Sequence, residues 1–319
     1  MGTVVLSLFD GVSAAQVALQ RLGVDVETYY ASEIDKHAIY VTQKNFPNTV
    51  QLGDVTNWRE WNIDFSQINL ILAGFPCQSW SVSGNQKGDN DERGKLFWTM
   101  LDIIKEVRKH NPTVEFLIEN VKMKKEFEEY ITKYLSEAVG EVHKMLINSA
   151  LVSAQSRNRY YWTSWKVGVQ PEDKDILLKD ILETDGLRKS SLAVLKIDSK
   201  FYEQPSNKTE GCIRVGGISM QEPPPKSFSQ GQRVYSIGGK SVTLSAQGGG
   251  QGAKTGLYKI DLPDGDYYIR KLTPIECERL QTFPDNFSEG ISNTQRYKCL
   301  GNSWTVDVIV HILKHLIKR

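Results

Sequence analysis

Cys77 is the residue of this chain best suited to nucleophilic chemistry. It follows the apolar residues 70–73 and a Gly-Phe-Pro turn, so we expect it at the carboxyl end of a strand, where a ligand can reach it. The thiolate of such a cysteine can attack an electrophilic carbon. The plainer alternative is a buried, unreactive thiol, because most intracellular cysteines are of that kind. The polar residues 78–94 that follow have the length of a loop that closes over a site.

Two further segments carry groups that can stabilise charge on a substrate. Glu119 follows the predicted strand at residues 114–118, and a carboxyl group held in a partly desolvated site can stay protonated and donate to a ring nitrogen. In residues 155–159, the alternation of side chains puts Arg157 and Arg159 on one face of an extended segment. Paired guanidinium groups can hold a base carbonyl, a phosphate or a carboxylate, although solvated surface arginines are commoner.

Three positions near the N-terminus suggest a nucleoside site. Residues 9–13 form a strand-to-helix turn whose backbone N–H groups can face a polar ligand, but only Gly11 stands where a phosphate loop has three glycines. Glu33 can accept both hydroxyl groups of a ribose, and Asp54 can accept from an exocyclic amine. Each acid alone is more often a solvated turn residue. Together they indicate adenosine without a phosphate, which favours S-adenosylmethionine over a nicotinamide dinucleotide.

The first half of the chain must supply the scaffold for these residues. Apolar runs at 4–9, 28–31, 70–73 and 114–118 alternate with helix-like stretches at 13–22, 36–45 and 95–109. This alternation predicts an α/β fold with a mostly parallel, doubly wound sheet. Ligands of such sheets bind beyond the carboxyl ends of the strands, and the acidic and cysteine-bearing stretches at residues 10, 33, 77 and 119 lie at those ends.

The second half has a different character. Residues 211–256 hold eleven of the 25 glycines, and residues 223–225 are a proline run. Helical periodicity returns only at residues 306–318. The composition predicts a smaller, β-containing and loop-rich domain.

The charge is divided along the chain. The 319 residues carry a formal net charge of +1, which alone argues weakly against a nucleic-acid partner. Residues 1–150, however, carry 15 lysines and arginines against 20 acids, and residues 188–259 carry 11 against 4. An acidic half with a basic segment of net charge +7 is typical of two tasks on one molecule.

Composition also excludes several protein classes. The chain is 40% hydrophobic and lacks both a membrane-length apolar run and a signal-peptide pattern, so we expect a cytoplasmic protein. Its four cysteines are scattered without a CxxC spacing or a histidine-rich partner cluster, which argues against disulfides and structural zinc. We expect Cys212, Cys277 and Cys299 to be structural, and no metal site.

In this order, the motifs resemble those of the C5-cytosine DNA methyltransferase family over nearly the whole chain. Residues 9–11 resemble the first cofactor motif, residues 74–78 the nucleophile motif, and residues 93–97 follow as expected. Residues 119–121 and 155–159 resemble the motifs that hold the base. Residues 270–276 with 279–284 resemble the motif that supports the recognition domain, and residues 301–303 resemble the last motif. Each is weak alone, but their common order and spacing argue against chance.

Two departures refine the resemblance. Ser13 stands where the first motif usually has a second glycine, and Trp304 stands where a small apolar residue is commoner. Both, with the opening Ser7-Leu8-Phe9-Asp10-Gly11, are similar to de novo-type animal enzymes and their phage or bacterial relatives. The short interval between Arg159 and Arg270 shows no chromatin-reading module and favours a small prokaryotic or phage enzyme.

The resemblance implies a methyltransferase sheet of Rossmann type in residues 1–185 and 296–319, and a target-recognition domain in residues 186–295. It implies methyl transfer from S-adenosylmethionine to C5 of a cytosine flipped out of double-stranded DNA, through a covalent Cys77 intermediate. The implied catalytic residues are Cys77, Glu119, Arg157 and Arg159. The implied cofactor-binding residues are Phe9, Asp10, Gly11, Ser13, Glu33, Ile34, Asp54, Val55, Gly74, Asn302, Ser303 and Trp304. The implied DNA-binding residues are Gln78, Ser79, Ser81, Arg233, Lys240, Thr243, Leu244 and Lys254.

Some alternatives stay open at this point. A tRNA cytosine methyltransferase shares these motifs, and a catalytically inactive DNA-binding relative is a further hypothesis. We expect a monomer or at most a weak homo-oligomer, without a membrane partner. The recognition sequence, the use of a modified methyl donor and a paired restriction enzyme do not follow from the sequence.

Overall fold

The computed structural model of the chain describes residues 2–76, 94–183, 200–246, 254–261, 265 and 267–317. The chain divides into two compact units. The first unit comprises Met1–Ile147, Asn158–Gln170 and Val308–Arg319, and the second comprises Asn148–Arg157 and Pro171–Asp307. This geometric division assigns residues 148–157, 171–185 and 296–307, expected in the catalytic domain, to the second unit. The functional boundaries at 185–186 and 295–296 stay a prediction.

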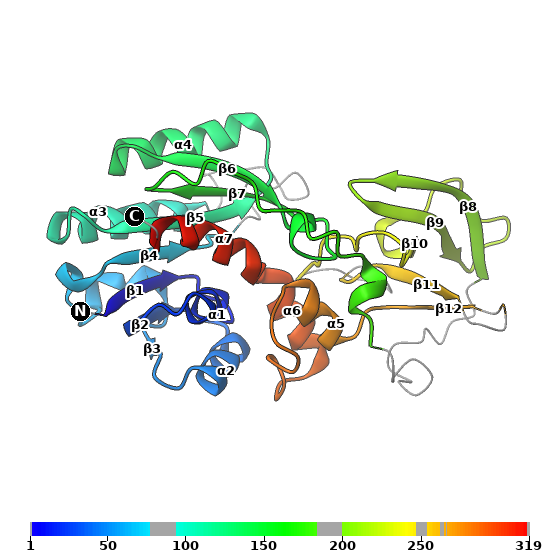
Figure 1. Cartoon of the computed structure of the whole chain (residues 1–319), viewed down its shortest axis with the longest axis horizontal. Helices are drawn as coiled ribbons and strands as arrows, with labels where there is room; N and C mark the ends of the chain where they lie inside the picture. The colour runs from blue at the N-terminus through cyan, green and yellow to red at the C-terminus, as the bar shows by residue number, and fades with distance from the viewer. Residues whose placement is uncertain are drawn as a thin grey trace. The chain divides into compact units, whose positions relative to one another are not determined.

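The first unit is built on a seven-stranded sheet in the order β3-β2-β1-β4-β5-β7-β6. Its strands are β1 (Thr3–Leu8), β2 (Val26–Ser32), β3 (Val50–Gln51), β4 (Leu70–Ala73), β5 (Glu115–Val121), β6 (His143–Asn148) and β7 (Asn158–Thr163). The strands from β3 to β5 are parallel to their neighbours, and β7 runs antiparallel to β5. Figure 1 shows β1 near the middle of this sheet, between β2 and β4. The predicted α/β fold with a mostly parallel sheet is confirmed.

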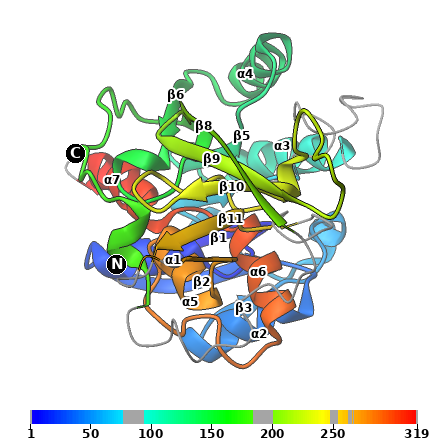
Figure 2. The same cartoon turned by 90° about the vertical axis from the view of Figure 1, so that its right-hand side faces the viewer.

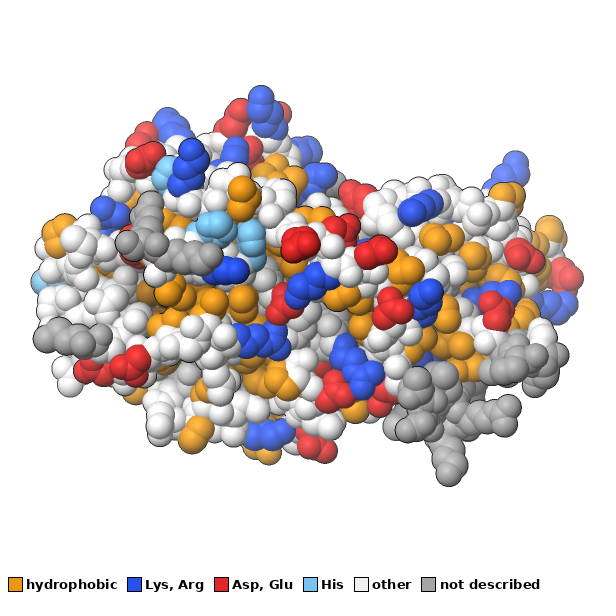
Figure 3. All heavy atoms as spheres, in the orientation of Figure 1, with side chains coloured by type: hydrophobic (Ala, Val, Ile, Leu, Met, Phe, Trp, Pro, Cys, Tyr) orange, Lys and Arg blue, Asp and Glu red, His pale blue; other side chains and the backbone are white. Residues whose placement is uncertain are grey.

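Helices lie where the sequence periodicity predicts them at residues 14–21, 36–45, 95–110 and 306–317, whereas the helix at residues 125–139 was not predicted. They are α1 (Ala14–Arg21), α2 (Lys36–Asn45), α3 (Lys95–His110), α4 (Lys125–Val139) and α7 (Val306–Ile317). Helix α2 begins at Asp35, whose carboxylate accepts a hydrogen bond of 2.9 Å from the N–H of His37 and so caps the helix. Helix α4 carries the exposed ion pairs Lys125–Glu129 and Lys133–Glu137. Figure 3 shows basic and acidic side chains side by side at the top of the view, where Figure 1 places α4.

The core of the first unit lies between the sheet and the helices α3 and α4. Every second side chain of β1, β4 and β5 faces α3 and α4, and the apolar faces of those helices fill the space between them. The central members are the fully buried residues Leu6, Leu8, Ile71, Phe116, Ile118, Phe97, Ile104, Ile131 and Leu135. Because the core fixes the register of these strands, it also fixes the positions of the turns at their carboxyl ends.

The second unit has a five-stranded sheet in the order β12-β11-β10-β9-β8. Its strands are β8 (Lys200–Thr209), β9 (Cys212–Ser219), β10 (Arg233–Ser236), β11 (Leu257–Asp261) and β12 (Tyr267–Arg270). Figure 2 shows β8, β9, β10 and β11 side by side. Two short helices, α5 (Pro274–Leu280) and α6 (Asn293–Asn302), complete the unit. The predicted β-containing character of this region is confirmed.

Buried ion pairs hold α5 and α6 in the second unit. Arg270 donates two hydrogen bonds of 2.6 Å to the carboxylate of Glu276, and both side chains are almost fully buried. Arg296 of α6 donates to Glu278 of α5 at 2.8 Å. Such pairs are costly to break because the remaining charge would stay buried without a partner.

Among the described helices, none is long and apolar enough to cross a membrane.

Candidate active site

The five residues after β1 form a strained turn, residues 9–13, which we call the β1 turn. Phe9, Gly11 and Ser13 all adopt the left-handed region, with φ of 57°, 61° and 58°. Glycine takes this conformation freely, whereas Phe9 and Ser13 do so at a cost of order 1 kcal/mol each. Such strain persists only where surrounding contacts hold it, and it is common at ligand sites.

Glu33 joins the end of β2 to the β1 turn. Its Oε2 accepts a hydrogen bond of 2.8 Å from the N–H of Gly11, and its Oε1 accepts from the N–H groups of Ile34 and Asp35. The carboxylate is therefore held in one orientation at the carboxyl edge of the sheet. Oε1 already accepts two hydrogen bonds, whereas Oε2 accepts one and can take a further hydrogen bond from a hydroxyl group of a ribose.

Asp54 lies at the end of the next strand. Its Oδ1 accepts at 2.8 Å from both the N–H and the hydroxyl group of Thr56, which caps the short helix Val55–Glu60. Ser32, the last residue of β2, donates at 2.8 Å to the carbonyl of Gly53 and fixes this turn against the sheet. Val55 is buried below it.

Asp10 is the inner carboxyl group of the β1 turn. It accepts from the hydroxyl group of Ser13 and, at 2.8 Å, from the hydroxyl group of Tyr29. Burial raises the pKa of Asp10 to about 6, and the hydrogen bonds from Ser13, Ser7 and Tyr29 oppose that rise. The expected cofactor contact of Asp10 stays a prediction, but its carboxylate already serves as a hydrogen-bond acceptor within the fold.

These residues fit S-adenosylmethionine better than a dinucleotide. The N–H of Gly11 is directed to Glu33, and the β1 turn has a single glycine, so it offers no Gly-rich cradle for a pyrophosphate. Ile34 is 73% exposed beside Glu33 and presents an apolar surface for a purine ring. The acceptor at Asp54 complements an exocyclic amine. The donors and acceptors thus match an adenosine without phosphates.

Asn120 supports the segment that leads to the nucleophile position. Its Nδ2 donates at 3.1 Å to the carbonyl of Phe75, and its Oδ1 accepts from the N–H of Val121 at 2.8 Å. Phe75 is buried against Phe97, with ring centroids 5.3 Å apart. The N–H of Gly74 donates to the carbonyl of Leu8 at 3.4 Å, so the end of β4 is tied to β1 as well.

Several predicted site residues lie outside the described residues. They are Cys77, Gln78, Ser79 and Ser81, and the expected closing loop at 78–94 falls there except for Gly94. Their roles stay predictions.

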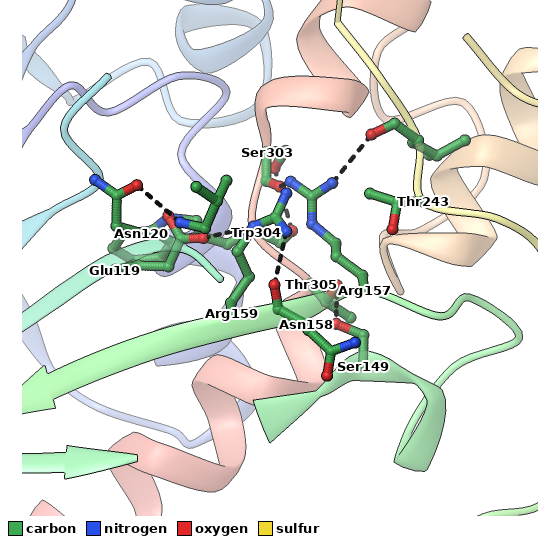
Figure 4. A network of polar contacts seen from close by, with 12 residues as sticks. Glu119, Asn120, Ser149, Arg157, Asn158, Arg159, Thr243, Ser303, Trp304 and Thr305 are labelled. Carbon is green, nitrogen blue, oxygen red and sulfur yellow. Dashed lines mark hydrogen bonds and ion pairs between the residues drawn. The ribbon is translucent and has the colours of Figure 1, made fainter. Parts of the chain in front are cut away.

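Glu119 and Arg159 form an ion pair on adjacent strands. The distance from Nε of Arg159 to Oε1 of Glu119 is 2.9 Å, and the two side chains are 13% and 11% exposed (Figure 4). The β5–β7 register places Val121 opposite Arg159 and Glu119 opposite Tyr161, so the pair is set by the antiparallel strand that the sequence did not predict. The arrangement combines a carboxyl group, able to exchange a proton, with a fixed guanidinium donor.

Arg157 serves a different set of partners. Its guanidinium donates to the carbonyls of Leu244 at 3.2 Å, Gly301 at 3.1 Å and Ser303 at 2.9 Å, and the residue is 3% exposed. Figure 4 shows the Arg157 guanidinium directed to these backbone groups. The expectation that Arg157 and Arg159 share one face and one ligand therefore needs correction. Arg157 precedes β7, and its side chain joins the end of α6 to the segment at Leu244.

Lys240 is also turned inward, contrary to its predicted DNA contact. Its ammonium donates to the carbonyls of Ala150 at 2.6 Å, Ser153 at 3.2 Å and Ile176 at 2.7 Å, and the residue is 8% exposed. Desolvation lowers the pKa of Lys240. Three carbonyls match the three donors of an ammonium group, so this lysine stabilises the second unit and cannot reach a phosphate in this arrangement.

The other predicted DNA contacts occupy varied positions. Thr243 is exposed and donates to the carbonyl of Ser156 at 2.5 Å, whereas Leu244 is buried and can offer only backbone groups. Arg233 is partly exposed and donates to the carbonyl of Phe228 at 3.1 Å. Lys254 is partly exposed. Thr243, Arg233 and Lys254 remain compatible with a contact to DNA.

The last motif lies at the end of α6 in the second unit. Asn302 is exposed, Ser303 is buried, and Trp304 is partly exposed. The side-chain amide of Gln281 donates to the carbonyls of Leu300 at 2.8 Å and Ser303 at 3.2 Å, so it supports this end together with Arg157. The sequence did not predict Gln281 as a supporting residue, because its partners, the carbonyls of Leu300 and Ser303, lie about twenty residues further along the chain.

The structural role expected of the three other cysteines stays a prediction, which their burial supports. Cys212, Cys277 and Cys299 are buried free thiols. Burial raises the pKa of Cys212 to about 11 and that of Cys277 well above its ordinary value, which makes both poor nucleophiles at neutral pH. Within the described ranges, no group of three or more His, Cys, Asp or Glu residues is arranged to hold a metal ion.

A model of C-5 cytosine-specific DNA methylases matches residues 3–318. The chain belongs to the C-5 cytosine-specific DNA methylase family. The enzyme class of this methylase is DNA cytosine-5 methyltransferase. It is similar to the type II methyltransferase M.HhaI of Haemophilus parahaemolyticus, with 33% identity over 325 residues that cover 96% of this chain and 92% of that protein. It is also 30% identical over 336 residues to the type II methyltransferase M.Bsp6I of Bacillus sp. (strain RFL6), with 98% of both chains covered.

Two solved structures share the fold of the methylase. The Entamoeba histolytica methyltransferase EhMeth matches 100% of this chain and 98% of its own with a TM-score of 0.69 and 18% identity. Dnmt2 of S. pombe matches 99% of this chain and 98% of its own with a TM-score of 0.68 and 16% identity. At these identities the likeness concerns the fold alone. The motif resemblance and the predicted methyltransferase sheet are both confirmed.

Proposed function

We propose that this methylase transfers a methyl group from S-adenosylmethionine to C5 of a cytosine in double-stranded DNA, through a covalent bond between Cys77 and C6. The observation that carries the proposal is the ion pair of Glu119 and Arg159 at the carboxyl end of β5. A largely shielded acid beside a fixed guanidinium is complementary to N3 and O2 of cytosine. The contact of Asn120 with Phe75 brings the segment before Cys77 to the same edge of the sheet.

The chain's own groups account for activation of the base. Attack by the Cys77 thiolate forms the C6–S bond and moves an electron pair toward C5. Glu119 shares a proton with N3, and Arg159 donates to O2, so both stabilise the charge that develops on the ring. S-adenosylmethionine supplies an electrophilic methyl group when bound. After C5 has taken the methyl group, it loses its proton to water, the C6–S bond breaks, and the thiolate leaves.

The proposal requires the cytosine to leave the DNA stack. C6 and N3 of a paired base are not accessible to protein side chains, so the base must be flipped out before Cys77 and Glu119 can act on it. Flipping costs a few kcal/mol, which contacts to the DNA backbone must offset.

The second unit is the proposed source of those contacts. Residues 188–259 carry a net charge of +7, which suits a phosphate backbone. Thr243, Arg233 and Lys254 remain candidates because each has an exposed or partly exposed side chain. We assign Lys240 a structural role instead, since its three donors serve backbone carbonyls.

Transfer of a tritiated methyl group tests the function. Purified protein is incubated with labelled S-adenosylmethionine and either duplex DNA or tRNA, and the labelled base is identified after hydrolysis. We expect 5-methylcytosine in the DNA only. Label in tRNA alone would favour the tRNA alternative, and label in neither substrate would contradict the proposal.

Matched variants connect the activity to the site. Glu119→Gln should lower the rate of transfer at least a hundredfold, because the amide cannot supply the proton at N3. Glu137→Gln makes the same change on an exposed residue of α4 and should retain the wild-type rate. Equal rates for the two variants would show that Glu119 takes no part in the reaction.

A further inference from the structure

The β1 turn contains a feature that cofactor contact alone does not explain. Ser13 has φ 58° and ψ 43°, a left-handed conformation that non-glycine residues rarely adopt, yet it immediately precedes α1. Its hydroxyl group does not cap the helix, although N-cap serines commonly do so. The hydroxyl group has other hydrogen-bond partners, and these indicate its role in the β1 turn.

The hydroxyl group of Ser13 lies in a buried polar network. It donates to Oδ2 of Asp10, lies 3.1 Å from Oγ1 of Thr42, and accepts from Nε2 of Gln16 at 3.2 Å. Ser13 and Thr42 are fully buried. Removal of the hydroxyl group would therefore leave buried polar groups without a partner, which is unfavourable.

Asp10 links this serine to the neighbouring strand. Its Oδ1 accepts from the hydroxyl group of Tyr29 at 2.8 Å, and Tyr29 lies in β2 with 3% of its surface exposed. The two carboxylate oxygens thus hold two hydroxyl groups from different elements. Because β2 is fixed in the sheet beside β1, Tyr29 anchors Asp10, and Asp10 anchors Ser13.

We propose that Tyr29, Asp10 and Ser13 form a positioning relay that holds the β1 turn in the shape the cofactor needs. In this relay the bond from Ser13 to Asp10 stabilises a backbone conformation that would otherwise call for glycine. The inference rests on the proposed use of S-adenosylmethionine, and it makes all three positioning residues for its site. Their contribution comes before the cofactor binds, because the turn is already shaped in the free protein.

The charge state of Asp10 gives the relay a pH dependence. Burial raises the pKa of Asp10 to about 6, above the value of about 3.9 of an unfolded chain. Ionisation of Asp10 therefore disfavours folding progressively between about pH 4 and pH 6, so this contribution to stability is larger at low pH. The relay needs the ionised form, because protonation turns one of the two carboxylate oxygens from an acceptor for its hydroxyl group into a donor.

Stability and cofactor affinity should therefore change in opposite directions. As the pH falls through about 6, protonation of Asp10 favours the folded state but removes an acceptor from the relay. A purely structural role would not lower affinity in this range. The other titratable groups that face Asp10 are Tyr29, whose pKa is raised well above its ordinary value by burial, and Glu33, whose charge adds repulsion.

Calorimetric titration with S-adenosylhomocysteine tests the relay in the wild-type protein. If only the ionised form holds the turn, about one molecule in eleven is competent at pH 5, and the apparent Kd should rise about tenfold between pH 7 and pH 5. Asp10→Asn should weaken binding at pH 7 and remove this pH dependence. A flat wild-type profile would overturn the relay, and so would a fall in affinity that persists in Asp10→Asn.

Two substitutions at one position separate the backbone from the hydroxyl group. Ser13→Ala keeps the left-handed strain and loses the bond to Asp10, so we expect the Kd at pH 7 to rise about tenfold. Ser13→Gly relieves the strain and should recover most of that loss, with little remaining dependence on pH. Equal affinities of the two variants would contradict the proposal.

Tyr29→Phe has a matched control in the second unit. It should raise the KM for S-adenosylmethionine severalfold and leave kcat nearly unchanged. Tyr297→Phe removes a hydroxyl group that donates at 2.8 Å to the carbonyl of Leu272, so it should lower stability without a change in KM. A rise in KM for both variants would indicate a general loss of stability and count against the relay.

Hydrogen exchange tests the relay without any cofactor. At pH 7, the amides of residues 9–13 should exchange about tenfold faster in Ser13→Ala than in Ser13→Gly. Wild-type protein that binds no S-adenosylhomocysteine at any pH would contradict the proposed function, and the exchange rates would still decide on the relay. Equal exchange in the two variants would overturn it.

Discussion

Replacement of Arg157 and Arg159 by lysine should separate their roles. Arg157 donates to three backbone carbonyls and is 3% exposed, whereas Arg159 pairs with Glu119 near the carboxyl end of β5. An ammonium group keeps the charge but loses the planar fork that reaches several acceptors at once. Arg157→Lys leaves one or two buried carbonyls unsatisfied at about 1–3 kcal/mol each, so we expect the free energy of unfolding to fall by roughly 2–4 kcal/mol.

Arg159→Lys should behave in the opposite way. Its guanidinium is the donor proposed for O2 of cytosine, and loss of such a donor typically lowers kcat by a factor of about 100–1,000. The ion pair with Glu119 can re-form with lysine, so the free energy of unfolding should change by less than about 1 kcal/mol. We therefore expect Arg157→Lys to lower the free energy of unfolding without a large fall in kcat. Arg159→Lys should lower kcat with little change in the free energy of unfolding.

Two measurements give the result. Guanidinium titration followed by circular dichroism reports the free energy of unfolding, and single-turnover methyl transfer at 20 °C reports the chemical step on folded protein. If Arg157→Lys lowered the single-turnover rate a hundredfold with wild-type stability, Arg157 would hold the base, and the assignment from these contacts would be wrong.

Three further perturbations follow from the described contacts. Lys240→Met removes the donor of three carbonyls, so the free energy of unfolding should fall by roughly 3 kcal/mol in denaturant titration, while the salt dependence of DNA binding stays the same in anisotropy measurements. Gly301→Ala would place a Cβ 2.4 Å from the backbone nitrogen of Ala246, so thermal melts should show severe destabilisation. Asn120→Ala loses the bond to the Phe75 carbonyl and should lower the single-turnover rate about tenfold without a change in Kd for S-adenosylhomocysteine.

Each of these has a contradicting result. A shallower salt slope with wild-type stability would return Lys240 to the DNA surface. A normal melting temperature for Gly301→Ala would show that the backbone at Ala246 moves easily. A Kd that rises as much as the rate falls in Asn120→Ala would show that its contact supports the cofactor turn as well.

The sequence predicts best the residues whose position depends on local periodicity. Leu8, Ser32 and Ala73 end their strands where apolar runs stop, and the parallel register brings those ends together, so Gly11, Glu33 and their neighbours fall at one edge of the sheet. The strands themselves are visible in the sequence as apolar runs, because side chains on both faces of the sheet are buried. Glu119 follows the same rule at the end of β5.

The sequence predicts poorly the side chains whose partners come from distant segments. Arg157 and Arg159 are two residues apart, yet one meets the carbonyl of Ser303 and the other meets Glu119. The basic residue Lys240 points inward because Ala150 and Ile176 offer carbonyls that only the tertiary fold brings near. A pattern of charge along the chain carries no information about such long-range acceptors.

Trapping with 5-fluorocytosine tests the central claim most directly. Duplex DNA that contains this base is incubated with the protein and S-adenosylmethionine, and the products are separated in denaturing gel. Because fluorine at C5 cannot leave as a proton does, the C6–S bond should persist after methyl transfer. The account predicts a denaturant-resistant protein–DNA complex for the wild type and none for Cys77→Ser. Absence of the complex in the wild type, or its persistence in Cys77→Ser, would contradict it.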